Sequence, residues 1–269
     1  DNGDLRPLEG PLTVSPAPTL AANPRSLFLY GAHWFSWGAV VNPVSSVVKE
    51  DPYDRVYFTG DGVPKYTRND IAVGAGVMPL ATRTLGVEQP QSPPVPNYTA
   101  PEDTDPYDNN TRYYVVTYVT SLGEEGPASA PSAKVVVIDP KVDVVPLTLP
   151  QPSVNTSDIS HVRVYRSVSA GDDADWVKVG DDVPLGTTTF NDTPSLSATY
   201  SLVTADYLPP PANLAGLVKV AGGYLAGFTG HTLCLSVAYH PYAWPRGYQQ
   251  IANADIVALA PMGNGVLVA

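Results

Sequence analysis

Short apolar or alternating runs recur along the chain, and turn residues separate them. Residues 26–30 (SLFLY) and 33–41 (HWFSWGAVV) are rich in aromatic and aliphatic side chains, which indicates β-strands. Residues 55–59 and 63–67 flank a Gly-Asp-Gly turn at 60–62. Because glycine adopts the positive φ values of tight turns at little steric cost, we expect these two runs to form a hairpin.

The strand signal is strongest in the middle of the chain. Residues 159–167 (ISHVRVYRS) alternate, so Val162 and Val164 are predicted on one face and Arg163 and Tyr165 on the other. Other runs here share a β-branched or aromatic composition: 112–120, 133–138, 176–179, 187–190 and 198–203. Turns at intervals of about 8–12 residues are typical of a β-sandwich or a barrel.

The last part of the chain has strand-like runs joined by glycine-containing turns. They cover residues 217–221, 224–228, 232–236, 256–259 and 265–268. Four short antiparallel strands with small-residue turns are typical of a propeller blade, and they fit a plain β-meander equally well. Earlier in the chain, residues 69–78 (NDIAVGAGVM) fit either a short helix or a strand broken by glycine.

Proline-rich segments divide the chain into five parts. Residues 1–25 are predicted to form an extended N-terminal arm and residues 87–109 a linker, because proline fixes φ and interrupts strands. The predicted fold class is all-β, with a sandwich at 110–208 inserted between residues 26–86 and 209–269, which pack together. The chain closes on the apolar run GVLVA, so we expect the last segment to be an incomplete sheet that further residues or a neighbouring subunit complete.

Composition and charge exclude several classes of protein. A hydrophobic content of 43% argues against intrinsic disorder, and 29 prolines with 22 glycines argue against a helical bundle. The net charge of −11 argues against a protein that grips nucleic acid, because phosphate binding needs clustered lysine and arginine. The single cysteine, Cys234, excludes an intramolecular disulfide and a cysteine-based zinc site. No apolar run of about 18 residues is present, so no membrane-spanning segment is expected.

The sequence shows no arrangement of residues that points to catalysis or metal binding. Four histidines lie far apart and lack metal-ligand spacing: His33, His161, His231 and His240. Two groups of acids lie in predicted loops and do not match a calcium-binding loop: Asp172, Asp173 and Asp175, and Glu102, Asp103 and Asp105. We therefore predict a non-enzymatic protein with no catalytic residue, no cofactor and no metal site.

Three tryptophans are candidate contact residues. Trp34 and Trp37 lie three positions apart in a strand-like run and are predicted on opposite faces. Trp244 lies between prolines in HPYAWPRGY. It fits either a loop anchor packed on the domain or a platform on which a sugar stacks, and the sequence leaves both interpretations open.

Residues 110–208 resemble a fibronectin type III or related immunoglobulin-like module. The segment YYVVTYVTSLGEEGPASAPS is similar to that family's late strand and its Gly-Pro-Ser turn. The segments HVRVYRS, WVKVGDDVPLGTTTFNDT and ATYSLVTA are similar to its central strands and the tyrosine-containing strand that follows. The order differs from the usual one, since the segment similar to a late strand comes first.

The flanking segments at 3–12, 37–70 and 210–248 resemble virion proteins of short-tailed bacteriophages, in particular the tail nozzle or tail tubular protein B. The resemblance implies a homohexameric ring in the virion tail, with propeller-like and immunoglobulin-like β-domains around the DNA exit channel. It implies the tail adaptor, portal-proximal proteins and tail fibres as partners, and a role in genome ejection. An acidic inner wall would let DNA pass without specific binding.

Two other classes of function remain open from the sequence. The first is a receptor- or glycan-binding adhesin of a virion or cell surface, built on the same β-domains, with Trp37 or Trp244 in the binding site. The second is a tail-associated depolymerase or lysin. Neither has a sequence motif in its favour, so the tail-ring subunit is the leading hypothesis.

Overall fold

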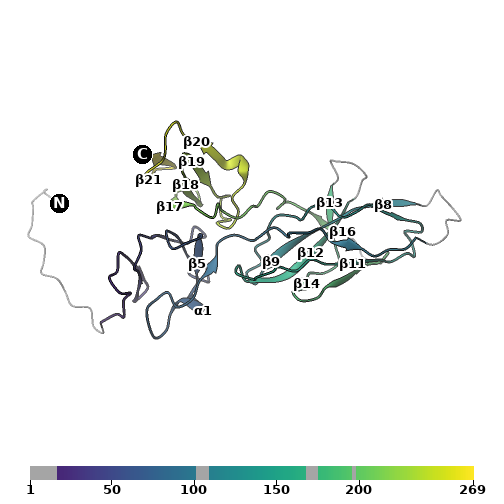
Figure 1. Ribbon diagram of the computed structural model, residues 1–269, viewed down its shortest axis with the longest axis horizontal. Helices are drawn as coiled ribbons and strands as arrows, with labels where there is room; N and C mark the ends of the chain where they lie inside the picture. Colours follow the sequence, from purple (N-terminus) through teal and green to yellow (C-terminus); the bar gives the residue numbers. More distant parts are fainter. Residues whose placement is uncertain (1–16, 101–108, 168–174, 196–197) are drawn as a thin grey trace, which may run out of the picture.

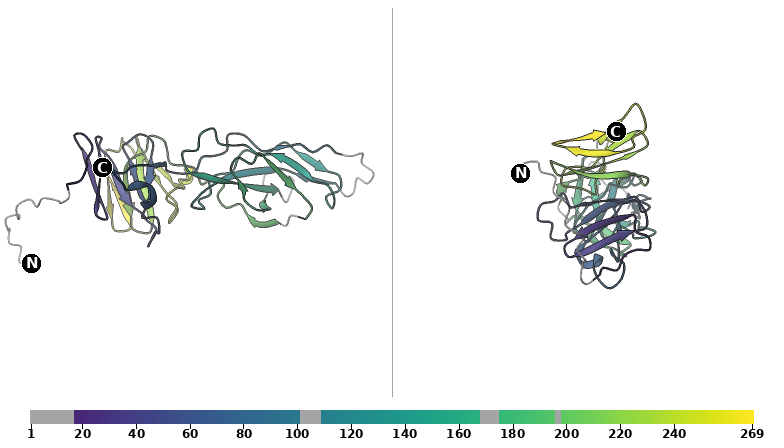
Figure 2. Two further views of the ribbon diagram at one scale, coloured as in Figure 1. Left: turned by 90° about the horizontal axis from the view of Figure 1, so that it is seen from below. Right: turned by 90° about the vertical axis from the view of Figure 1, so that its left-hand side faces the viewer.

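The computed structural model describes residues 17–100, 109–167, 175–195 and 198–269. They form an elongated molecule of two lobes (Figures 1 and 2). The first lobe contains strands from both ends of the chain, and the second contains strands from its middle. The predicted all-β fold class is confirmed, because all paired strands are antiparallel and the only helices are the short α1 (Asn69–Ala72) and η1 (Arg246–Tyr248) within the described ranges.

The N-terminal part of the first lobe contains a hairpin and a four-stranded sheet. The hairpin pairs β1 (Ser26–Tyr30) with β2 (His33–Trp37). The sheet has the order β3 (Asn42–Ser45), β4 (Val56–Thr59), β5 (Lys65–Thr67) and β6 (Arg83–Thr84). Tyr57 faces Tyr66 across β4 and β5, which confirms the predicted hairpin. The segment at 69–78 begins as helix α1.

The C-terminal part of the first lobe is a meander followed by a hairpin. The meander contains β17 (Ala215–Val220), β18 (Tyr224–Thr229), β19 (Thr232–Leu235) and β20 (Gln249–Ile251), and the hairpin contains β21 (Leu259–Met262) and β22 (Gly265–Val268). β17 lies against the N-terminal sheet, where the Leu217 amide donates to Thr59 Oγ1 at 3.3 Å and the Lys219 ammonium donates to the Ser46 carbonyl. Segments from the two ends of the chain therefore build one lobe.

The second lobe is a β-sandwich. In one sheet, β12 (Ile159–Ser167) pairs with β9 (Tyr114–Thr120) on one side and with β13 (Trp176–Val179) and β14 (Val183–Pro184) on the other, and β13 pairs with β16 (Ala198–Ser201). The facing strands are β7 (Val95–Pro96), β8 (Asn110–Arg112), β10 (Val135–Val137), β11 (Val145–Thr148) and β15 (Thr189–Asp192). Val162 and Val164 of β12 share a buried cluster with Val145 and Leu147 of β11. The core of the sandwich lies between the two layers.

The two lobes have separate sheets but a shared apolar core. Within the described ranges, no strand of residues 110–208 joins a sheet with a strand of residues 26–86 or 209–269. The main buried cluster nevertheless extends from Val116 in the sandwich through Val87 to Trp244 in the first lobe. Apolar burial is the main stabilising contribution to folding, so this shared cluster couples the lobes.

Two details of the sequence interpretation need correction. The range 87–109, predicted as a linker, contributes β7, which pairs with β11 and belongs to the sandwich. Proline is tolerated there because β7 is an edge strand and Pro96 loses no hydrogen bond to a second neighbour. The strand predicted over 33–41 ends at Trp37. Residues 1–16 of the predicted arm and 101–108 of the predicted linker lie outside the described residues.

Gly60, at the turn of the β4–β5 hairpin, is predicted to resist substitution. Its φ is +101°, and a Cβ at this position would lie 2.2 Å from the carbonyl oxygen of Val40. We expect Gly60→Ala to lower the free energy of unfolding by more than the roughly 1–3 kcal/mol of backbone strain alone. Gly62→Ala is the matched control, because Gly62 has φ +79° but its nearest atom, Lys65 Nζ, is 4.0 Å away. Urea denaturation of both variants measures the difference, and equal losses would contradict the steric argument.

Candidate functional site

The two tryptophans proposed for a glycan site are buried. Trp37 is 7% exposed and Trp244 is 1% exposed. Trp37 packs on Phe58 with ring centroids 5.3 Å apart, and Trp244 donates its indole N–H to the Pro241 carbonyl at 2.9 Å. Neither ring can stack on a sugar without local unfolding. The interpretation of Trp244 as a packed loop anchor is the one that the structure supports.

The histidines and loop acids do not come together. The ring of His161 bonds the Ser160 hydroxyl at 2.8 Å, and the ring of His240 bonds the Ala238 carbonyl at 2.9 Å, so both make local contacts. Asp175 is exposed, while the other five loop acids named above lie outside the described residues. In the part of the chain that the structure describes, no three histidine, cysteine or acidic side chains are grouped to hold a metal.

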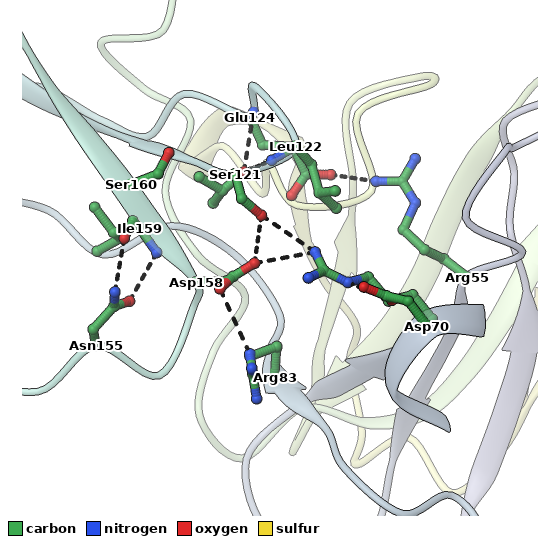
Figure 3. Close-up of polar contacts among 12 residues, drawn as sticks. Arg55, Asp70, Arg83, Ser121, Leu122, Glu124, Asn155, Asp158, Ile159 and Ser160 are labelled. Carbon is green, nitrogen blue, oxygen red and sulfur yellow. Dashed lines mark hydrogen bonds and ion pairs between the residues drawn. The ribbon is translucent and has the colours of Figure 1, made fainter. Parts of the chain in front are cut away.

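An extended polar arrangement lies at the junction between the lobes, which we call the lobe junction (Figure 3). Arg55, just before β4, contacts Asp51 in its own lobe at 2.7 Å and Glu124 of the sandwich at 2.5 Å. The Arg55 and Glu124 side chains are only 10% and 12% exposed. Burial raises the pKa of Glu124, and the positive charge of Arg55 opposes this rise. An ion pair that is largely shielded from solvent therefore connects the segment before β4 to the turn after β9.

A second set of contacts at the lobe junction is centred on Asp158, which precedes β12. Its carboxylate lies 3.0 Å from Arg68 and 3.9 Å from Arg83, and it accepts a hydrogen bond from the Ser121 hydroxyl. Burial alone would raise the pKa of Asp158, but the Ser121 hydrogen bond and the two arginines lower it overall. Asp158 stays charged at neutral pH and pairs with Arg68 and Arg83 of the first lobe.

The backbone around Asp158 is held in place by a side chain. Asn155 accepts a hydrogen bond from the Ile159 amide at 2.8 Å and donates one to the Ile159 carbonyl at 2.7 Å. Asp158 has φ +63°, a value that aspartate tolerates better than most residues. The loop thus presents its carboxylate toward the first lobe in a fixed position (Figure 3).

Close backbone packing completes the lobe junction. A Cβ on Gly126 would lie 2.8 Å from the Val87 side chain, and one on Gly86 would lie 2.7 Å from Pro209. The Thr204 hydroxyl donates to the Gly126 carbonyl at 3.0 Å. The apolar contacts and the ion pairs fix one orientation of the lobes.

Sequence reasoning missed these residues because a pair such as Arg55 and Glu124 is 69 positions apart. The Glu124-Glu125 dipeptide reads as an exposed turn. In the structure, Glu124 faces the other lobe, whereas Glu125 accepts hydrogen bonds from Thr117 and Tyr165, both at 2.6 Å. The only available signal was two acids in the turn that follows the predicted strand at 112–120.

A double-mutant cycle measures the contribution of the bridging ion pair. We expect Arg55→Met and Glu124→Gln to be coupled by about 1–3 kcal/mol in the free energy of unfolding, because the pair is shielded from water. The matched control is Lys49→Met with Glu50→Gln, an exposed pair at 3.5 Å, whose coupling should stay below about 0.5 kcal/mol. Coupling of the same size in both cycles would contradict a role for burial.

Neither helix in the described residues has the length and apolar character needed to cross a membrane. No protein-family model matches the chain, and a search of curated proteins finds no matching sequence.

Proposed function

We propose that this chain is a non-enzymatic structural subunit of a bacteriophage tail, which forms the nozzle ring at the DNA exit channel. The proposal rests on the resemblance of residues 37–70 and 210–248 to tail nozzle proteins. One structural observation supports it best. These two segments, far apart in sequence, pack together in the first lobe through the Leu217–Thr59 and Lys219–Ser46 hydrogen bonds.

The lobe junction suits a load-carrying role. A ring subunit must keep the relative orientation of its domains while its neighbours and the DNA exert force on it. The buried Arg55–Glu124 pair, the partly exposed pairs of Asp158 and the glycine contacts supply that rigidity, and breaking a buried pair costs about 3–5 kcal/mol. In this proposal the tail adaptor, portal-proximal proteins and tail fibres are the partners, and the protein is located in the virion tail.

The net charge of −11 fits a channel through which DNA slides. Like charges repel, so an acidic wall keeps a polyanion from binding as it passes. The adhesin alternative placed Trp37 or Trp244 in its binding site, and both side chains are buried.

The decisive experiment is to determine the assembly state and the location of the protein. We expect the full chain to form rings of six copies in electron micrographs and native mass spectra, and to be detected in the tail of purified virions by antibody labelling. We also expect no gel shift with double-stranded DNA at physiological salt. A trimer would instead favour a fibre or spike, and a protein absent from virions would refute the proposal.

A further inference from the structure

Two hairpins of the first lobe are apolar on both faces, and β1–β2 is the first. Phe28 and Phe35 are paired across this hairpin, on the side that packs in a buried aromatic cluster. Leu29 and Trp34 are paired on the opposite side. Antiparallel strands that are covered on one face usually alternate apolar and polar residues, so apolar residues on both faces indicate cover on both.

The outer face of the β1–β2 hairpin is nevertheless exposed. Leu29 is 55% exposed, Leu27 is exposed as well, and Trp34 is partly exposed beside them. Ser36, on the same side, is covered, because its hydroxyl accepts a hydrogen bond from the Ala21 amide at 2.8 Å. We call Leu27, Leu29 and Trp34 the β1–β2 outer face.

The β21–β22 hairpin has the same character. Leu259 and Val266 pack against a buried cluster of the meander. The positions that alternate with them lie on the other side and are exposed, and we call them the β21–β22 outer face: Ala258, Ala260, Met262, Leu267 and Ala269. Leu267, for example, is 53% exposed. Among the described residues, both hairpins thus leave an apolar layer uncovered.

Neither hairpin carries a charged side chain. Residues 26–37 and 256–269 contain no aspartate, glutamate, lysine or arginine, although the chain as a whole has a net charge of −11. A charged partner would lose its hydration on such a face without compensation, so an uncharged apolar face is the better partner. Equally acidic copies of this chain repel each other over most of their surface, and the uncharged hairpins are where a second copy can approach.

The two outer faces differ in side-chain size, which makes them complementary. The β1–β2 outer face presents the bulky Leu29 and Trp34 next to each other across the hairpin. The β21–β22 outer face presents small alanines and, next to the turn, the flexible side chain of Met262. Packed sheets interdigitate their side chains, and large residues fit opposite small ones.

The positions of the hairpins favour a contact between unlike faces. Figure 2 shows β1–β2 in purple and β21–β22 in yellow apart from each other on the first lobe, and each packs on its own buried cluster. A contact between like faces of two copies would leave the other hairpin of each copy uncovered. A head-to-tail contact covers both hairpins with one repeated interface.

We propose that the first lobe binds a second copy of this chain head to tail, with the β1–β2 outer face of one copy packed on the β21–β22 outer face of the next. Repeated contacts of this kind close into a ring or continue as an open filament, depending on the rotation between copies. The contact itself does not rest on the proposed role in a phage tail. Only its closure into a ring of six copies does.

A lysine placed on each outer face tests the contact. We expect analytical ultracentrifugation of the full chain to show self-association in the micromolar range. Leu29→Lys and Leu267→Lys should each raise the dissociation constant about 10-fold or more, because the added charge would be buried without a partner. Val63→Lys is the matched control and should leave association unchanged, because Val63 is a 42% exposed apolar residue of the same lobe outside both faces.

A mixture of the two variants tests the head-to-tail arrangement. The Leu29→Lys chain keeps its β21–β22 outer face, and the Leu267→Lys chain keeps its β1–β2 outer face. An equimolar mixture should therefore form dimers and nothing larger, while each variant alone stays monomeric. A contact between like faces would instead leave one of the two variants associating on its own. Thermal unfolding followed by circular dichroism checks that each variant is folded.

The proposal is overturned if the unchanged chain stays monomeric at high micromolar concentration, the result expected if another segment of the chain or a different protein covers these faces. It is also overturned if either lysine variant associates like the unchanged chain. Dimers in the mixture, with an unchanged chain that assembles into a number other than six, would support the contact and refute the nozzle ring. Rings of six that both variants preserve would support the ring and refute the contact.

Discussion

Replacing Asp192 with alanine is expected to lower the free energy of unfolding by about 3–5 kcal/mol, the range for breaking a buried ion pair by removing one partner. Asp192 ends β15 and is 0% exposed. Its carboxylate lies 3.1 Å from Arg112 and 2.9 Å from Arg166, and it accepts a hydrogen bond from the Tyr114 hydroxyl at 2.7 Å. One carboxylate thus pairs with two guanidinium groups inside the sandwich.

The large effect follows from what remains after the substitution. The Arg112 side chain is 7% exposed and cannot reach bulk water without disturbing the sandwich. Arg166 and the Tyr114 hydroxyl lose the same acceptor. Leaving a charged group buried and unpaired costs more than the pair contributes when it is intact.

Two further variants make the expectation specific. Asp192→Asn keeps the volume and one acceptor oxygen, so we expect it to lose less stability than Asp192→Ala. Asp181→Asn removes an exposed carboxylate of the same lobe and should change stability by no more than about 0.5 kcal/mol. Urea denaturation followed by circular dichroism measures all three. A loss for Asp192→Ala no larger than that for Asp181→Asn would show that the buried pair is dispensable.

The strands were predictable where the alternation of side chains is regular. β1, β12 and β13 have the predicted bounds, and burial alternates along β1 at the two-residue period of a strand. β11 was not predicted because Pro146 lies within it. Pro146 has no N–H to donate, and its carbonyl accepts a hydrogen bond from the Asn97 amide at 2.8 Å.

The lobe junction and the buried charges were not predictable in the same way. Arg112 and Asp192 are 80 positions apart, so no local pattern marks them as partners. A single acid at the end of a run such as TTTFND reads as a solvated turn residue. Which charges become buried depends on how the sheets pair, and sheet pairing is a property of the whole fold.

The second large effect is expected at Trp244. Trp244→Ala should lower the free energy of unfolding by about 3–5 kcal/mol, the range for deleting a large aromatic core side chain. The side chain is 1% exposed and belongs to the buried cluster that extends into both lobes. Its backbone amide also donates to the Leu208 carbonyl at 2.8 Å, where the chain returns from the sandwich. The residue therefore connects the loop after β19 to the lobe junction.

The loss of unfolding free energy in Trp244→Ala should have two sources, the apolar volume and the indole hydrogen bond, and a second variant separates them. Trp244→Phe keeps much of the apolar volume but removes the indole N–H that Pro241 accepts, so we expect a smaller loss than for alanine. Tyr248→Ala, at a 48% exposed aromatic of the same region, is the control and should change stability by about 0.5 kcal/mol or less. Denaturation is followed by circular dichroism, because the substitution itself alters tryptophan fluorescence.

Hydrogen exchange in the Trp244→Ala variant tests the coupling of the lobes. If the shared cluster holds them together, the variant should unfold at lower urea concentration, and hydrogen exchange should rise both in β17–β19 and at the Gly126 end of the sandwich. If exchange rises only around residues 236–248, Trp244 stabilises its own loop and the lobes are held together by the Arg55 and Asp158 ion pairs instead. The exchange pattern thus decides whether apolar burial or charge pairing is the main connection between the two lobes.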